Sequence, residues 1–178
     1  MSIAVPQGVH SIEVAYIGSK AVPKAVAPTS EPGPALPLLP RYIGIQPFWP
    51  APPTEQAFLY PSPQEWDLIP VDTAIDNGKR YIKNKYEDKY LYPSPVLEGY
   101  IMAGDNRFVW DIIHSFDLLT FKISVNLGGK ECAIGVEKPR IDPPGDDAVL
   151  PPVYLPALVL QTQADAATWI FQEPRTPK

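Results

Sequence analysis

The sequence predicts an all-β protein, and two observations lead to this prediction. A tryptophan followed two positions later by a large apolar residue occurs three times, at residues 66–68, 110–112 and 169–171. Side chains alternate between the two faces of an extended chain, so both members of each pair point the same way. The chain also contains 24 prolines, which are excluded from helix interiors and from central strands. We therefore expect short strands joined by long, stiff loops.

The three tryptophans, Trp66, Trp110 and Trp169, are 44 and 59 residues apart. A repeat of this length cannot bury its apolar face alone, so its copies must pack on one another. We predict twelve short strands in three modules of four, each ending in a tryptophan strand whose indole enters a shared core. The modules cover about residues 8–72, 76–115 and 118–173. The longer second spacing keeps open the alternative of three unrelated core tryptophans.

The first module is expected to contain four strands, at residues 10–16, 20–26 and 41–46 and around Trp66. In the first of them, Ile12, Val14 and Tyr16 lie on one face, which is typical of a half-buried strand. Two Pro-rich loops, residues 27–40 and 47–63, separate the later strands. Their composition favours polyproline conformation, which is stiff rather than flexible.

The second module opens with a tight-turn signal at residues 76–79, Asp-Asn-Gly-Lys. Its strands are expected at residues 80–83, 89–92, 100–102 and 108–113. Residues 107–119 also fit a helical stripe, with Ile112, Ile113, Phe116 and Leu119 at helical spacing. We prefer a strand there because the tryptophan pattern and the β-branched run both favour it.

The third module is expected to contain strands at residues 119–125, 132–136, 157–161 and 168–172. Phe121, Ile123 and Val125 share a face in the first of these. A long, acidic and Pro-rich loop at residues 137–156 divides the module.

The bulk composition limits the class of protein. With 178 residues the chain is expected to form a single domain, residues 1–178. Its net charge of −5 and the absence of a basic run predict that it binds neither nucleic acid nor an anionic membrane. No stretch resembles a signal peptide or a membrane span. The single cysteine, Cys132, cannot form an internal disulfide. We therefore expect a cytoplasmic protein.

The sequence does not predict an enzyme. His10 and His114 are the only histidines, and each is interpreted as a surface or turn residue. Cys132, between apolar neighbours, is interpreted as a buried, inert thiol. The acidic residues at 142, 146 and 147 lack the ligand spacing of a calcium loop. No cofactor and no metal site are expected.

Several short stretches together resemble the small cytosolic β-trefoil proteins of mushrooms. They are residues 8–18, 77–81, 109–112, 121–125 with 135–136, and 169–172. That group includes ricin-B-like lectins, a family of serine-protease inhibitors, and the clitocypin and macrocypin inhibitors of cysteine proteases. The details lean towards the serine-protease inhibitors, although the loops at 27–40 and 47–63 are longer and richer in proline than the family pattern. The resemblance implies a β-trefoil fold.

Protease inhibition is the function that we prefer. A tight inhibitor presents a loop already fixed in its bound shape, and proline supplies such stiffness. In the loop that ends Leu39-Pro40-Arg41, Arg41 would suit the acidic pocket of a trypsin-like enzyme, and Lys24 is a weaker candidate. The resemblance to clitocypin implies that Asn84 reaches an asparaginyl endopeptidase. Inhibition of a cysteine protease would instead use paired loops without one key residue. The expected partner is therefore a target protease.

A carbohydrate-binding lectin is the alternative. Residues 64–66, Gln-Glu-Trp, match a lectin Gln-x-Trp pattern, but the other two tryptophan strands do not. Trp49, Tyr60 and Tyr92 lie among predicted loops and could stack on a glycan, although packing of their own loops is the simpler interpretation. In a third class of function the Pro-rich loops would only pack against partner subunits.

Overall fold

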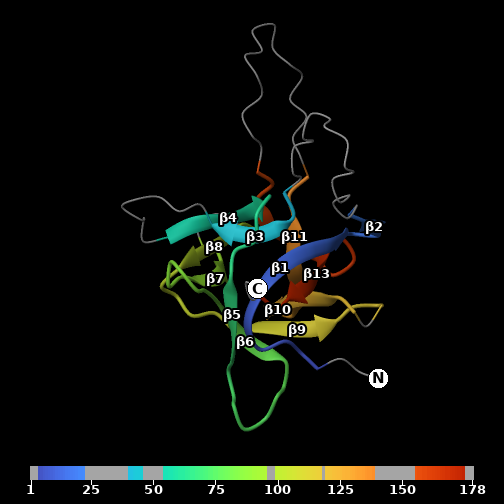
Figure 1. Ribbon diagram of the computed structural model, residues 1–178. Coiled ribbons are helices and arrows are strands. Elements are labelled where there is room, and N and C mark those ends of the chain that lie inside the picture. Colours follow the sequence, from blue (N-terminus) through green and yellow to red (C-terminus); the bar gives the residue numbers. More distant parts are fainter. Residues whose placement is uncertain are drawn as a thin grey trace, which may run out of the picture.

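The structure of the protein is a computed structural model, which describes residues 4–22, 40–45, 54–95, 99–117, 119–138 and 155–174. Within these ranges the chain is all-β, with thirteen strands and no helix, and so without a helix able to span a membrane. The strands (Figure 1) are β1 Gly8–Ile17, β2 Lys20–Ala21, β3 Tyr42–Ile45, β4 Thr54–Tyr60, β5 Trp66–Pro70, β6 Lys79–Asn84, β7 Tyr90–Pro93, β8 Ile101–Gly104, β9 Trp110–His114, β10 Phe121–Leu127, β11 Lys130–Val136, β12 Leu158–Thr162 and β13 Ala167–Gln172.

Six of the strands form a closed ring of antiparallel ladders. Around the ring, β1 pairs with β5, β5 with β6, and β6 with β9. The ring continues from β9 to β10 and from β10 to β13, and it closes where β13 pairs with β1. The first and last long strands of the chain are therefore neighbours, and no ring strand is left with an open edge.

Three hairpins stand outside the ring: β3 with β4, β7 with β8, and β11 with β12. They also meet one another, because β4 pairs with β8 and two isolated bridges join Phe58 to Ala157 and Tyr100 to Val159. Strand β2 pairs only with β1 and lies at the margin of the sheet.

The core is organised around three fully buried tryptophans at the starts of β5 and β9 and within β13. The indole N–H of Trp66 donates to the carbonyl of Ile43 on β3, at 2.9 Å. That of Trp110 donates to Leu91 on β7 at 2.9 Å, and that of Trp169 to Ile134 on β11 at 3.3 Å. Each tryptophan thus joins a ring strand to the first strand of a hairpin, and its N–H is satisfied inside the core.

The predicted count of twelve strands in three groups of four is wrong, because thirteen are described. The difference arises in the first third of the chain, where β4 (Thr54–Tyr60) occupies part of the expected Pro-rich loop at residues 47–63. Its buried residues Glu55, Ala57 and Leu59 alternate with half-buried ones, which is the strand period. Prolines flank this strand without entering it. The helical alternative for residues 107–119 is also wrong, since Trp110–His114 is a strand.

Candidate functional site

The described residues contain no group of three His, Cys, Asp or Glu side chains that could hold a metal ion. His10 Nδ1 lies 3.2 Å from the Gly8 carbonyl oxygen, and the ring of His114 packs on Phe121 with centroids 4.7 Å apart. Cys132 is half-buried, rather than fully buried as expected, and packs against the core from β11. Each of these three side chains therefore takes part in hydrogen bonding or packing within the fold.

Arg41 does not extend into solvent. Its residue is 8% exposed, and its Nε lies 2.6 Å from the Glu13 carboxylate, which also accepts a hydrogen bond from Gln172. The pairing of Glu13 with Tyr42 across β1 and β3 brings the two charges together. A protease pocket takes up only an exposed side chain. Because Arg41 is buried, the expectation that it is offered to such a pocket is wrong. Lys24 and Leu39 lie outside the described residues.

Asn84, the other predicted contact residue, is 2% exposed at the end of β6. Its Oδ1 accepts hydrogen bonds from the backbone N–H groups of Tyr86 and Glu87, both at 3.0 Å. Its Nδ2 donates to Gln64 at 3.2 Å. The amide therefore holds the β6–β7 turn in shape instead of reaching outward, and the exposed aromatic side chain of this turn is Tyr86, at 70%.

A groove of about 780 Å³ crosses the outer face of β1. The buried Glu13–Arg41 pair lies along it, and Tyr16, Val22, Tyr42 and Leu119 contribute to its lining. A second hollow of about 420 Å³, lined by Tyr86 and Glu65 among others, shares Tyr42 and Gln172 with the groove. The two hollows are therefore neighbours, and both offer aromatic faces beside charged and amide groups.

Two Pro-rich segments, residues 23–39 and 139–154, have described ends that lie close together. The N–H of Arg41 donates to the carbonyl of Tyr60, and the N–H of Leu59 to that of Pro156, both at 2.8 Å. The N–H of Glu137 donates to Ala157 at 2.9 Å. The end of β4 thus fixes the C-terminal flanks of both segments, and Glu137 is held next to them.

The turn between β9 and β10 carries the most exposed large apolar side chain of the described residues, Phe116, at 73%. A hydrogen bond of 2.8 Å from the N–H of Ser115 to the carbonyl of Thr120 closes the turn. Asp117 Oδ1 accepts from the N–H groups of Leu119 and Thr120, at 3.1 and 2.9 Å, and from the Thr120 hydroxyl at 2.7 Å. Burial raises the pKa of Asp117, but these hydrogen bonds outweigh it and the net pKa is lowered.

The sequence does not single out this turn, because Phe116 and Leu119 also fit the apolar stripe of a helix. A local signal was present: Asp117 followed by Thr120, between two runs of strand residues, is typical of a side-chain-stabilised turn. Tyr42 was assigned only to a strand, since no sequence pattern reveals which face of β3 borders a groove.

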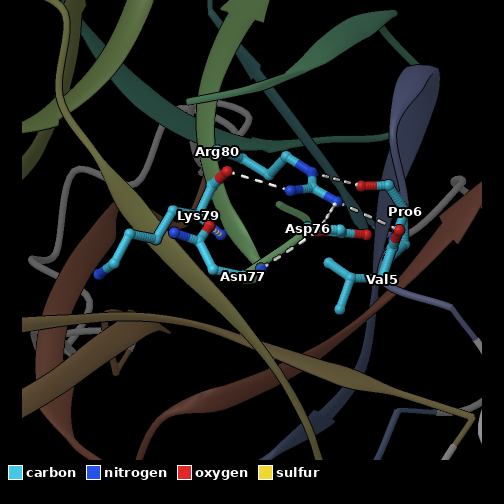
Figure 2. A network of polar contacts seen from close by, with 7 residues as sticks. Val5, Pro6, Asp76, Asn77, Lys79 and Arg80 are labelled. Carbon is cyan, nitrogen blue, oxygen red and sulfur yellow. Dashed lines mark hydrogen bonds and ion pairs between the residues drawn. The ribbon is translucent and has the colours of Figure 1, made fainter. Parts of the chain in front are cut away.

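A buried polar cluster outside the groove surrounds Arg80 and serves the fold. Arg80 is fully buried, and Figure 2 shows its guanidinium group between the N-terminal arm and the turn before β6. It donates to the carbonyls of Pro6 at 2.9 Å, Lys79 at 3.0 Å and Val5 at 3.4 Å, and to Asp76 at 2.8 Å. A fully buried cation of this kind is not accessible to a ligand.

Comparison of the chain with protein-family models, with curated proteins and with solved structures finds no significant match.

Proposed function

We propose that the chain folds as a β-trefoil, in which three strand groups related by pseudo-threefold symmetry surround one core. Three features support this fold: the ring of six strands, the three hairpins that meet outside it, and the tryptophans that bond to β3, β7 and β11. In such a frame β2, which pairs only with β1, lies outside the three strand groups and accounts for the thirteenth strand.

We propose further that the protein inhibits a protease by binding it through its Pro-rich segments. The observation that carries this proposal is the meeting of the C-terminal flanks of residues 23–39 and 139–154 at the end of β4. Segments rooted side by side can contact one partner together, and their prolines reduce the conformational entropy lost on binding. The target is a serine or a cysteine protease.

The burial of Arg41 changes the expected mode of inhibition. With its guanidinium group paired to Glu13, no basic side chain from this position is offered to a trypsin-like pocket. Contact by two adjacent segments, without one key basic residue, agrees better with the geometry. Asn84 is likewise committed to its own turn, so reactivity towards an asparaginyl endopeptidase is not expected from it.

Inhibition assays with trypsin, chymotrypsin, papain and an asparaginyl endopeptidase test this function. We expect inhibition of at least one enzyme at micromolar concentration or below. Replacement of residues 23–39 or 139–154 by a Gly-Ser linker of equal length should weaken it at least tenfold, while the melting temperature changes little. No inhibition of any of the four enzymes at micromolar concentration would refute the proposal.

Carbohydrate binding is a second candidate, because the groove across β1 has the chemistry that a sugar requires. Tyr16 and Tyr42 offer ring faces, and the Glu13–Arg41 pair and Gln172 offer acceptors and donors for hydroxyl groups. A glycan array with the whole protein tests it. A hit that is lost in Tyr42→Ala but kept in Tyr90→Phe, a change in a buried tyrosine, would place the sugar in this groove.

A further inference from the structure

We infer that Phe116, presented by the β9–β10 turn, is the side chain that enters the specificity pocket of the target, and that this target is a chymotrypsin-like protease with an apolar pocket. The inference rests on the proposed function and names the kind of protease. It replaces Arg41, whose burial removes it from this role.

Phe116 is the most exposed large apolar side chain of the described residues. The Phe116 side chain is 73% exposed, and its ring makes an edge contact with the Tyr16 ring at 5.3 Å. Apart from this contact, the stability of the fold does not require a large apolar side chain at this position. Leu119, at the other end of the same turn, is 66% exposed. Exposed apolar residues that gather on one protruding element mark an interaction site, and aromatic side chains dominate binding energies at such sites.

Hydrogen bonds hold the turn that carries Phe116 in a fixed shape. Three hydrogen bonds to one oxygen of Asp117, with the Ser115–Thr120 bond across the base, fix the backbone of the turn on both sides of its tip. Thr120, which supplies two of these bonds, is only 3% exposed and anchors the turn to the start of β10. A turn already fixed in shape loses little entropy on binding, which is the requirement for a tight inhibitor.

The turn that carries Phe116 also lies beside the groove. Asp117, Leu119 and Thr120 line the same groove as Val22 and Arg41. Val22 and Arg41 flank the Pro-rich segment at residues 23–39. The turn therefore borders the same groove as the described flanks of that segment. Phenylalanine suits the hydrophobic slot of a chymotrypsin-like enzyme and not the acidic pocket of a trypsin-like one.

The test is a set of inhibition constants for the whole protein and four variants against chymotrypsin, trypsin and papain. Phe116→Ala should weaken inhibition of chymotrypsin at least about 30-fold, the effect of removing an aromatic anchor. Phe116→Arg should lose chymotrypsin and gain trypsin, because only the pocket residue sets that preference. Asp117→Ala should weaken chymotrypsin inhibition several-fold by loosening the turn.

Ile75→Ala is the matched control, since Ile75 is a large apolar residue of similar exposure, 65%, that precedes β6 and lines neither hollow. It should leave all constants within twofold. Because Phe116 is mostly exposed, its variants are expected to fold, and circular dichroism melts check this. Inhibition of chymotrypsin that is unchanged by Phe116→Ala, or inhibition of papain that depends on Phe116, would overturn the inference and leave the inhibitor function standing. If none of the three enzymes is inhibited, the inference falls, and inhibition of the asparaginyl endopeptidase then decides whether the proposed function survives.

Discussion

Arg80 shows how one buried side chain can tie the N-terminal arm to the turn before β6. Its guanidinium group is fully buried and donates hydrogen bonds to the carbonyls of Pro6, Lys79 and Val5 and to the carboxylate of Asp76 (Figure 2). The planar fork can bind groups in several directions at once, which a lysine ammonium group cannot do in the same geometry. The hydrogen bond from Arg80 is also the main reason that the pKa of Asp76 is lowered.

We predict that Arg80→Met lowers the free energy of unfolding by about 3 kcal/mol, because the buried carbonyls lose their donor. Urea unfolding measures the loss, and NMR titration should show the pKa of Asp76 rising towards its ordinary value. Lys85→Met is the control: the Lys85–Glu65 pair is half exposed on the lysine side, and water screens it so that it is expected to contribute little to stability. Equal losses in the two variants would contradict the prediction.

Glu55 is the opposite case, a buried charge without a partner. It is 7% exposed, and neither carboxylate oxygen has a hydrogen bond. Burial raises the pKa of Glu55 above 4.5, nearby Glu87 raises it further, and Lys89 opposes both. A carboxyl group whose pKa is raised by folding stabilises the fold below its unfolded pKa, and this stabilisation is lost as the pH rises through the folded pKa.

We therefore expect Glu55→Gln to gain stability relative to the unmodified protein as the pH rises from 4 to 7. The difference at pH 7 should be about 1–2 kcal/mol, the cost of a buried unsatisfied charged group. Urea unfolding at both pH values measures it. Glu131→Gln removes the same charge from an exposed position and should show no such trend. A difference between Glu55→Gln and the unmodified protein that is independent of pH would count against this account.

At the scale of elements, the three tryptophans perform the same task in three places. Each is fully buried and donates its indole N–H to the first strand of a hairpin. Replacing one by phenylalanine would leave a cavity and an unpaired buried carbonyl. If the sites are equivalent, the three losses should also be equivalent.

We predict that Trp66→Phe, Trp110→Phe and Trp169→Phe each destabilise the protein by about 2–3 kcal/mol and agree within about 1 kcal/mol. Chemical denaturation followed by far-UV circular dichroism measures this without relying on tryptophan fluorescence. One variant with a loss near zero would show that its indole is not part of a repeated arrangement, and the β-trefoil proposal would lose its main support.

At the scale of the whole molecule, the ring closes only through its last strand. β13 pairs with β1 over the stretch from Ser11 to Ile17 and also contacts β10 at Phe121. Without it, both of these strands would expose an edge and the core would lose Trp169. The N-terminal and C-terminal strands therefore depend on each other for stability.

A chain that ends at Asp165 is accordingly predicted not to fold cooperatively, whereas a chain that ends at Pro174 should melt like the full-length protein. Differential scanning calorimetry and binding of a hydrophobic dye distinguish the two outcomes. The longer truncation keeps all of β13 (Ala167–Gln172) and serves as the control. A cooperative melt of the shorter chain would show that β1 and β10 do not need this partner.

The sequence by itself determined the all-β class and the positions of most strands. The alternation of Ile12 and Val14 and of Phe121 and Ile123 is a local property that survives in any fold burying one face. The sequence did not reveal β4, because the prolines on either side of this strand hid the alternation of its seven residues. Only the tertiary structure decided the candidate site: whether a side chain is buried depends on strands distant in sequence, which cover Arg41 with Glu13 and leave Phe116 uncovered.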